Sequence, residues 1–528
     1  MSQMLKSSGA MAAATLASRI LGLVREIVYA HLMGNGLVAS AFGYAFQVPN
    51  LFRRLLGEGA LTAAFIPHFK ELEKQQGEVR MWHAANAVVS ALVVVAAAAV
   101  GIVVLTASGL IWSQLFSNKM MLMLDLLRWM CPYLLLVCLA ALFMGMLNAR
   151  GHFFVPALGA GLLNIVMIAS VFWIAPSMGK TLDRQVFGLA IGVVIAGFAQ
   201  CFYQLPLLRK EGFRYRWVTP WGDPSVRHVA RQMLPGVLGV AAFQINVLVA
   251  GGFGYWFGDH IVSSFNYAVR LMELPQGLFG ASLATYLLPT LSALATDKKY
   301  PEFRTTLQEG VGAVLFTNVA AAALLLALGE PIVRLLFERG KFDAVATDNV
   351  AQALRFLAPG LLAFSVVNIL ARAFYALGDT STPTKISIAC LILNLVLTLL
   401  FIQNLQQAGM ALANTMTSGA NMILLLFTLR KKLGKLEFGR LARSLSPLAA
   451  AGLLTGMIAW GVMLLWERRL GHAGFLLRLG EVFVPAAAAG GAYLAATWFL
   501  RIGYGHEAME MLARKVRSRL PSATGPNP

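Results

Sequence analysis

The sequence predicts an all-α polytopic membrane protein with about 14 transmembrane helices, arranged as two six-helix lobes in a parallel pseudo-repeat plus two C-terminal helices. Composition is the first observation: 58% of the 528 residues are hydrophobic and 13% are charged, whereas soluble domains are about 25% charged. The second observation is a succession of apolar runs of about 20 residues or more, long enough to cross a bilayer. The third is a set of segments that repeats in the two halves of the chain.

Polar gaps separate the apolar runs and give the approximate bounds of each predicted span. The first six spans are predicted near 7–32, 37–66, 82–108, 121–149, 153–176 and 186–208. The next six are predicted near 229–257, 261–290, 306–328, 346–377, 383–403 and 409–430. The last two are predicted near 446–466 and 478–500.

The charge of the loops predicts the orientation. The formal net charge is +19, and Lys and Arg gather in the gaps that follow even-numbered spans, above all at 209–231 and 430–443. The loop near 331–345 is a mild exception. Because basic loops stay on the cytoplasmic side of a membrane, both termini are predicted to be cytoplasmic. The positive charge is thereby accounted for without a nucleic-acid partner.

Three pairs of segments carry the internal repeat, at an offset of 222 to 227 residues. LRWMCPYLL at 127–135 resembles LRFLAPGLL at 354–362, and this match continues through Gly151 and Gly378. The other pairs are SAFGYAF from Ser40 with SSFNYAV from Ser263, and ALTAAFIPHF from Ala60 with SLATYLLPTL from Ser282. Since six spans per half is an even number, the two halves share one orientation, an architecture typical of transporters.

The repeat also divides the chain into predicted domains. An N-terminal six-helix lobe is expected over 1–215 and a C-terminal six-helix lobe over 216–440. Two extra transmembrane helices follow over 441–505, and a basic cytoplasmic tail over 506–528. The extra helices have no counterpart in the first half, which indicates a task specific to this protein.

A polar stripe runs along the first span. On a helical wheel at about 100° per residue, Ser18, Arg19, Arg25 and Glu26 fall within an arc of about 120°, and most of the remaining positions are apolar. An arginine that faces lipid at the middle of the bilayer costs roughly 3 kcal/mol. The stripe is therefore predicted to face protein or a water-filled cavity.

The eighth span carries a second polar stripe. Ser263, Asn266, Arg270 and Glu273 share one face of the predicted helix. Pro275 follows them, and a proline at that position bends or interrupts a helix. This stripe resembles the first in combining arginine, a carboxylate and small polar groups.

The second span adds further polar residues after Pro49. Asn50, Arg53 and Arg54 share a face, and Glu58 lies close to them in the sequence. The repeat makes the second and eighth spans equivalent, so their polar faces are predicted to meet. The result would be a cationic cluster within the membrane, formed by Arg19, Arg25, Arg53 and Arg270.

Arginine is suited to phosphate, because the guanidinium stays charged and donates two parallel hydrogen bonds to phosphate oxygens. A surplus of arginines over Glu26 and Glu273 thus predicts an anionic substrate. As an alternative, the arginines could pair with Glu26, Glu58 and Glu273 only to lock helices together, as in a scaffold that transports nothing. The sequence lacks HExxH, nucleophile-elbow and Walker motifs, so it predicts no enzyme or ATPase, and no cofactor or metal site.

Three segments resemble the MurJ (MviN-type) lipid II flippases of the MOP exporter superfamily: SRILGLVRE, PNLFRRLLGEGALTAAFIP and YAVRLMELPQG. The resemblance extends over essentially the whole chain. It implies two six-helix lobes around an arginine-lined cavity for a lipid-linked pyrophosphate, and two last helices that hold the polyprenyl tail. It also implies a flippase of the bacterial inner membrane that moves lipid II to the periplasmic leaflet by alternating access, with the cell-wall synthesis machinery as a further partner.

Carried over by motif, the resemblance assigns pyrophosphate binding to Arg19, Arg25, Arg53 and Arg270. The acidic or gating positions are Glu26, Glu273 and Glu58, and the polar cavity positions are Ser18, Asn50, Ser263 and Asn266. One departure is Ser40, which stands where relatives often carry an acidic residue. An alternative function is another MOP-type exporter, for a lipid-linked oligosaccharide or a drug.

Overall fold

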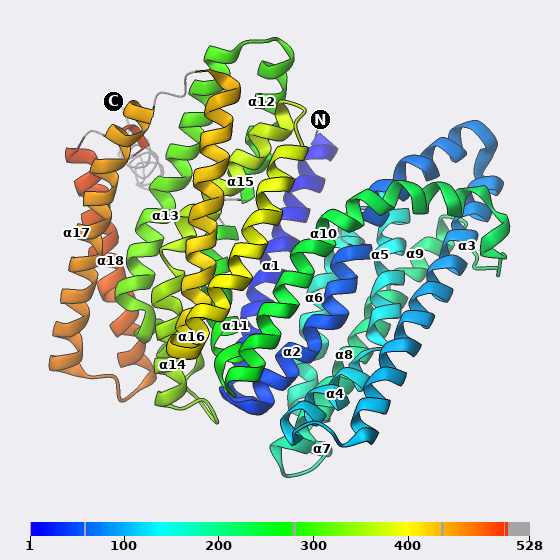
Figure 1. The fold of residues 1–528 in the computed structure, drawn as a ribbon, viewed down its shortest axis with the longest axis horizontal. Coiled ribbons are helices and arrows are strands. Elements are labelled where there is room, and N and C mark those ends of the chain that lie inside the picture. Colours follow the sequence, from blue (N-terminus) through cyan, green and yellow to red (C-terminus); the bar gives the residue numbers. More distant parts are fainter. Residues whose placement is uncertain (1, 58–59, 278–280, 435–437, 501, 505–528) are drawn as a thin grey trace, which may run out of the picture. The chain divides into compact units, whose positions relative to one another are not determined.

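The computed structural model describes residues 2–57, 60–277, 281–434, 438–500 and 502–504. These residues form helices joined by short turns, and the described part of the chain contains no strand (Figure 1). The predicted all-α class is therefore confirmed. The chain divides into two compact units, each described by itself: unit 1 comprises 1–266 and 337–346, and unit 2 comprises 267–336 and 347–528.

Unit 1 begins with α1 (Ser2–Met33), which packs along α6. Its other long helices form a core in which α3 contacts both α5 and α10. The elements after α1 are α2 (Leu37–Phe52), η1 (Arg53–Gly57), α3 (Ala60–Ser113), α4 (Asn118–Met130), α5 (Tyr133–Ala149), α6 (Phe154–Ala169), η2 (Ser170–Ile174), α7 (Ala175–Ser177), α8 (Leu182–Phe202), α9 (Leu205–Lys210), η3 (Pro220–Gly222) and α10 (Pro224–Phe257). The first residues of α11 (Ile261–Pro275) and the segment 337–346 complete the unit.

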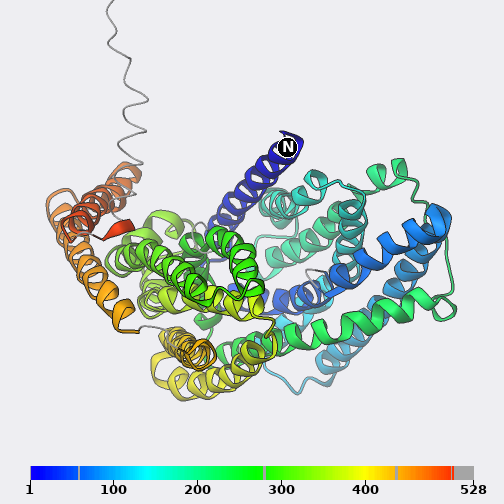
Figure 2. The same cartoon turned by 90° about the horizontal axis from the view of Figure 1, so that it is seen from above.

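Unit 2 contains the rest of α11 and the helices that follow. They are α12 (Ala281–Thr296), α13 (Tyr300–Phe337), α14 (Ala344–Leu357), α15 (Gly360–Ala376), α16 (Ser381–Leu433), α17 (Phe438–Leu470) and α18 (Phe475–Phe499). Helices α17 and α18 form a hairpin and lie side by side along their length (Figures 1 and 2). Helix α15 packs on α16 in the same antiparallel manner.

Among the described residues, seven helices are long and apolar enough to cross a membrane, or nine if each of two bent pairs is one span. One of the seven is α16, in which the non-helical Gln406 (φ 48°) separates the predicted spans 383–403 and 409–430. Gly77 (φ 82°) breaks α3 in the same way. The chain is thus a multi-pass membrane protein, while the number of fourteen spans and the predicted domain boundaries stay predictions. The predicted tail at 506–528 lies outside the described residues.

The internal repeat is visible in the backbone. Helices α4 and α5 are bent by 41° around Cys131 and Pro132, and α14 and α15 are bent by 47° around Ala358 and Pro359. The two prolines are equivalent in the sequence repeat. A proline has no N–H for the helical hydrogen-bond ladder and clashes with the preceding turn, which explains why both halves bend at this position.

The same repeat recurs where α5 and α15 end. Gly151 has φ 86° and Gly378 has φ 74°, the left-handed conformation that glycine adopts at no steric cost. In each case the next residue donates its backbone N–H to the last helical turn: His152 to the Leu147 carbonyl and Asp379 to the Phe374 carbonyl, both at 2.9 Å. This pattern is a Schellman cap, which satisfies carbonyls at a helix end.

Candidate functional site

Helix α1 positions the first polar stripe. The Ser18 carbonyl accepts a hydrogen bond from Asn164 Nδ2 of α6 at 3.0 Å. Arg25 is buried, with 7% of its surface exposed, whereas Arg19 is exposed. Six positions apart, these arginines lie about 120° from each other on a helix, at opposite edges of the stripe. Helix α6 packs against α1 and covers part of its surface.

Arg25 keeps hydrogen-bonding capacity although it is buried. Its Nη2 donates to the Glu26 carboxylate at 2.5 Å, and its guanidinium carbon lies 5.5 Å from the centre of the Tyr29 ring. Its Nε–H is buried and has no hydrogen-bond partner among the described residues. A buried donor without an acceptor costs free energy, so this N–H is suited to donate a hydrogen bond to an anionic oxygen.

The backbone of the second span changes from α-helix to π-helix at the predicted arginines. Helix α2 continues past Pro49, and the chain then forms the π-helix η1, which contains Arg53 and Arg54. Arg53 Nε donates to Asn50 Oδ1 at 3.2 Å, so these two residues do share a face as predicted. Short π-helical segments are frequent at functional sites. The predicted acidic residue Glu58 lies outside the described residues.

The third arginine site lies on α11 in unit 2. Arg270 Nη1 contacts the Glu273 carboxylate at 2.8 Å, and the two side chains are 47% and 45% exposed. The pair joins residues one turn apart on a single helix. Both groups are therefore more accessible than the buried Arg25–Glu26 pair of unit 1.

Within unit 1, the polar residues of α2 and of the start of α11 contact each other directly. Ser40 Oγ donates to Ser263 Oγ at 3.1 Å, and the Ser263 N–H donates back to Ser40 Oγ at 3.2 Å. Ser263 Oγ in turn donates to Asn35 Oδ1 at 2.5 Å. Ser40 and Ser263 are equivalent positions of the repeat, and both are buried. The structure uses them to join two helices, and it adds Asn35, which the sequence patterns did not single out.

Asn266 lies one helical turn further along, beside α2. A methyl group placed on Gly43 would come within 3.2 Å of Asn266 Nδ2. Gly43 and Asn266 are again equivalent in the repeat, so a small residue faces a polar one where the two helices cross. Without a side chain at Gly43, the Asn266 amide can lie close to the α2 backbone.

The predicted residues are thus brought together in pairs. Arg25 contacts Glu26, Arg53 contacts Asn50, and Arg270 contacts Glu273, each pair within one continuous stretch of chain. The predicted cluster of all four arginines draws on both units and stays a prediction.

One buried ion pair lies outside the motifs of the sequence. Arg334 of α13 contacts Glu481 of α18 at 2.6 Å, and Glu481 is fully buried. The signal in the sequence was Arg334, one of the basic residues that departed from the loop-charge pattern near 331–345. Its partner is 147 residues away, so no local pattern pointed to it.

Comparisons with known proteins agree with this architecture. The family model described as "Lipid II flippase MurJ" matches residues 29–480. A probable lipid II flippase MurJ of Vibrio cholerae is 33% identical, with 80% of this chain and 82% of that protein covered. The lipid II flippase MurJ of Burkholderia cenocepacia is also 33% identical, with coverage of 84% and 88%. A Bdellovibrio bacteriovorus relative is 32% identical over 94% of this chain and 95% of its own length.

Solved structures show the same fold. A lipid II flippase MurJ in an inward closed conformation aligns with a TM-score of 0.75 at 22% identity, covering 93% of this chain and 98% of that one. An inward-facing multidrug resistance MATE family transporter of the MOP superfamily aligns with a TM-score of 0.64 at 14% identity, with coverage of 81% and 98%. The family match extends over most of the chain, and the relatives are similar along most of their own length. The chain therefore belongs to the MurJ lipid II flippase family.

Proposed function

We propose that this protein is a lipid II flippase of the bacterial inner membrane, which moves the undecaprenyl-pyrophosphate-linked peptidoglycan precursor from the cytoplasmic to the periplasmic leaflet. Membership of the MurJ family over residues 29–480 is the observation that carries this proposal. The MurJ family is a family of transporters, which agrees with a multi-pass membrane protein rather than an enzyme. Both termini lie in the cytoplasm in this proposal, and the cell-wall synthesis machinery is a partner.

The arginines supply the chemistry of substrate binding. Arg19, Arg25, Arg53 and Arg270 bind the pyrophosphate oxygens, because guanidinium groups hold phosphate with paired hydrogen bonds. The unpartnered Nε–H of Arg25 and the half-exposed guanidinium of Arg270 support this role. Glu26 and Glu273 balance the positive charge before substrate enters, and they compete with the pyrophosphate when it leaves.

Alternating access completes the cycle. Bending of the second and eighth spans at Pro49, at η1 and at Pro275 absorbs the rearrangement, since hinges are short segments that tolerate backbone change. Helices α17 and α18 shelter the polyprenyl tail in this mechanism. The substrate's phosphates remain with the arginines until the cavity opens to the periplasm.

The membrane potential contributes to the driving force, because the sequence has no Walker motif for ATP hydrolysis. An inside-negative potential favours outward movement of negative charge by about 2.3 kcal/mol per charge per 100 mV. We expect dissipation of the potential to slow flipping by protein reconstituted in vesicles. An unchanged rate would rule out this contribution.

The experiment that tests the proposal is a leaflet-accessibility assay for lipid II in cells that depend on this protein. We expect Arg25→Ala and Arg270→Ala to abolish the appearance of lipid II in the outer leaflet, because each removes a phosphate-binding group. Arg128→Ala is the matched control, since Arg128 forms a similar pair with Asp125 three residues earlier, outside the predicted site. Lipid II should still reach the outer leaflet in the control.

Membrane insertion and thermal unfolding of each variant distinguish transport from scaffolding. Arg270→Ala should insert and unfold like the parent while flipping is lost, because its guanidinium is half exposed. Arg25→Ala should also insert but lose stability, because it leaves Glu26 in a poorly exposed site without its counter-charge. If Arg270→Ala instead unfolded at a much lower temperature, or if both variants flipped lipid II normally, the proposed arginine site would be wrong. Normal outer-leaflet lipid II after depletion of the whole protein would overturn the function itself.

A further inference from the structure

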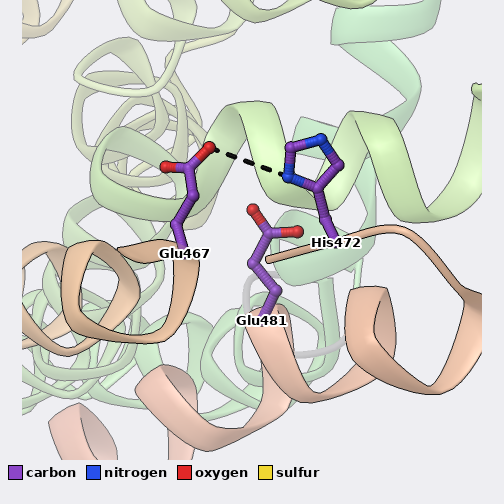
Figure 3. Close-up of side chains that lie close together, drawn as sticks. All are labelled: Glu467, His472 and Glu481. Carbon is purple, nitrogen blue, oxygen red and sulfur yellow. Dashed lines mark ion pairs between the residues drawn. The ribbon is translucent and has the colours of Figure 1, made fainter. Parts of the chain in front are cut away.

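Three potential metal ligands meet at one end of the α17–α18 hairpin (Figure 3). Glu467 lies near the end of α17, His472 lies in the turn, and Glu481 lies in α18. Their ligand atoms all lie within 4.8 Å of one another, and His472 Nδ1 is 3.7 Å from Glu467 Oε1. The hairpin thus brings together three groups that are separated by 4 and 8 residues in the sequence.

Two of these groups have buried atoms without a hydrogen-bond partner. Glu481 is 0% exposed, and its Oε1 accepts a hydrogen bond from Arg334 Nη1 at 2.6 Å. Its other oxygen, Oε2, has no hydrogen-bond partner among the described residues, and neither has His472 Nδ1. A buried carboxylate oxygen without a donor is costly. A cation between Oε2 and Nδ1 would satisfy both atoms.

The charges around the cluster also leave room for a cation. A pocket of about 270 Å³ is lined by Glu330, Arg334, Arg355, Glu467 and Glu481. Arg334 contacts Glu330 at 2.7 Å as well as Glu481, and Arg355 contacts Glu330 at 3.4 Å. Arg478 Nε donates to the backbone carbonyl of His472. Arg334 and Arg355 thus contact Glu330, and Arg334 also contacts one oxygen of Glu481, whereas Glu467 contacts His472.

We propose that His472 Nδ1, Glu467 and Glu481 Oε2 bind a divalent transition-metal ion of the zinc class. Zinc is bound by histidine nitrogen and carboxylate oxygen at about 2.0–2.2 Å, so neighbouring ligands of a tetrahedral site lie about 3.4 Å apart. The His472 Nδ1–Glu467 Oε1 distance of 3.7 Å is close to this value. All the ligand atoms lie within 4.8 Å of one another, so binding of the ion would draw the three side chains together. A nitrogen ligand favours zinc over magnesium and calcium, which prefer oxygen alone.

Arg334 has a second role at this site. Groups that bond to the non-coordinating atom of a ligand orient it toward the metal, and Arg334 holds Glu481 Oε1 in this way. The metal would link α17, the turn and α18, while the Arg334–Glu481 contact links α18 to α13. The site would therefore fasten the C-terminal hairpin to the rest of unit 2, whether or not the protein flips lipid II.

Zinc binding to the tag-free, full-length protein in detergent tests this proposal. We expect isothermal titration with zinc chloride to show one site per chain, and zinc to raise the unfolding temperature. His472→Gln and Glu467→Gln should each weaken zinc binding by about 100-fold or more, because each removes a direct ligand. Both side chains are about 40% exposed, so these variants should fold. His31→Gln, at an exposed histidine of α1, is the control and should bind zinc like the parent.

Three results would overturn the proposal. Equal zinc affinity in the parent and in His472→Gln would show that any bound zinc lies elsewhere. An absence of zinc binding to the parent would leave the cluster as an ion-pair network only. Calcium and magnesium serve as comparison ions, and either binding as tightly as zinc would contradict a site with a nitrogen ligand.

Discussion

Units 1 and 2 each contain an arginine–carboxylate pair within a single helix, but the two pairs lie in different surroundings. In unit 1 the Arg25 and Glu26 side chains are only 8% and 13% exposed, whereas in unit 2 the Arg270 and Glu273 side chains are about half exposed. Charges that are shielded from water interact strongly and depend on their partners, while water screens exposed charges. The same residue types should therefore contribute to stability in unit 1 and chiefly to ligand contact in unit 2.

The largest expected effect comes from removing one carboxylate at a time. Glu26→Gln should destabilise the protein by about 3 kcal/mol, because it leaves Arg25 buried without a counter-charge. Glu273→Gln should cost less than about 1 kcal/mol, since exposed pairs contribute little. Thermal or denaturant unfolding in detergent measures both changes. Similar losses for the two variants would show that burial does not distinguish the pairs.

The turns that follow α5 and α15 give a second comparison, in which the two units should behave alike. Both turns depend on a glycine with positive φ, Gly151 or Gly378, and a methyl group added at either would meet nothing within 4 Å. Gly151→Ala and Gly378→Ala should therefore each cost about 1–2 kcal/mol, from backbone conformation alone. Unfolding measurements on both variants test this equality.

Asparagine provides the control for the glycine variants, because it tolerates the left-handed conformation better than alanine. Gly151→Asn and Gly378→Asn should thus lose less stability than the alanine variants. A loss confined to one unit would mean that the two turns are not equivalent, despite their matching hydrogen bonds.

These turns also show what local sequence can predict. Pro132 and Pro359 bend their helices, and Gly151 and Gly378 cap theirs, because proline and glycine act through the backbone of their own neighbourhood. The all-helical class and the repeat followed from such local patterns and from long apolar runs. The contact between Ser40 and Ser263 joins two positions that the repeat had already matched.

The remaining features depend on packing, which a helical wheel does not contain. The wheel placed Arg19 and Arg25 on one stripe, yet only Arg25 is buried, because burial depends on which neighbouring helices cover each edge of the stripe. The contact of Arg334 with Glu481 depends on the packing of α13 against α18, and the Glu467–His472–Glu481 cluster depends on the α17–α18 hairpin. Charged residues inside apolar helices were the available signal, without any indication of their partners.

The turns that follow α5 and α15 differ in the sign of the charge that each turn contributes to its ion pair. In unit 1, Glu211 is the acceptor for Arg150 Nε and His152 Nε2, both at 2.8 Å. In unit 2 the signs are exchanged: Asp379, equivalent to His152, accepts from Lys432 at 2.6 Å. One backbone geometry is thus supported by opposite arrangements of charge.

The smallest expected effect is the pH dependence of these two surface pairs. Hydrogen bonds from Arg150 and then His152 lower the pKa of Glu211, and hydrogen bonds from Lys432 and then Thr382 hold the pKa of Asp379 well below its ordinary value. Each carboxylate therefore stabilises the folded chain fully above its ordinary pKa, 4.5 for Glu and 3.8 for Asp. That contribution is lost as the pH falls through the lowered pKa of the folded state.

Unfolding temperatures measured between about pH 1.5 and pH 7 test this assignment. Glu211→Gln should remove the part of the acid-induced decrease in stability that comes from protonation of Glu211. Asp379→Asn should remove a separate part of this decrease, which occurs at lower pH. Lys432→Met should mimic Asp379→Asn and leave the Glu211 part intact, because it deletes the partner that lowers the pKa of Asp379. Lys432→Met could instead change the pH profile as Glu211→Gln does. In that case the carboxylates Glu211 and Asp379 would not titrate independently, and the ion pairs at the two turns would not be separate.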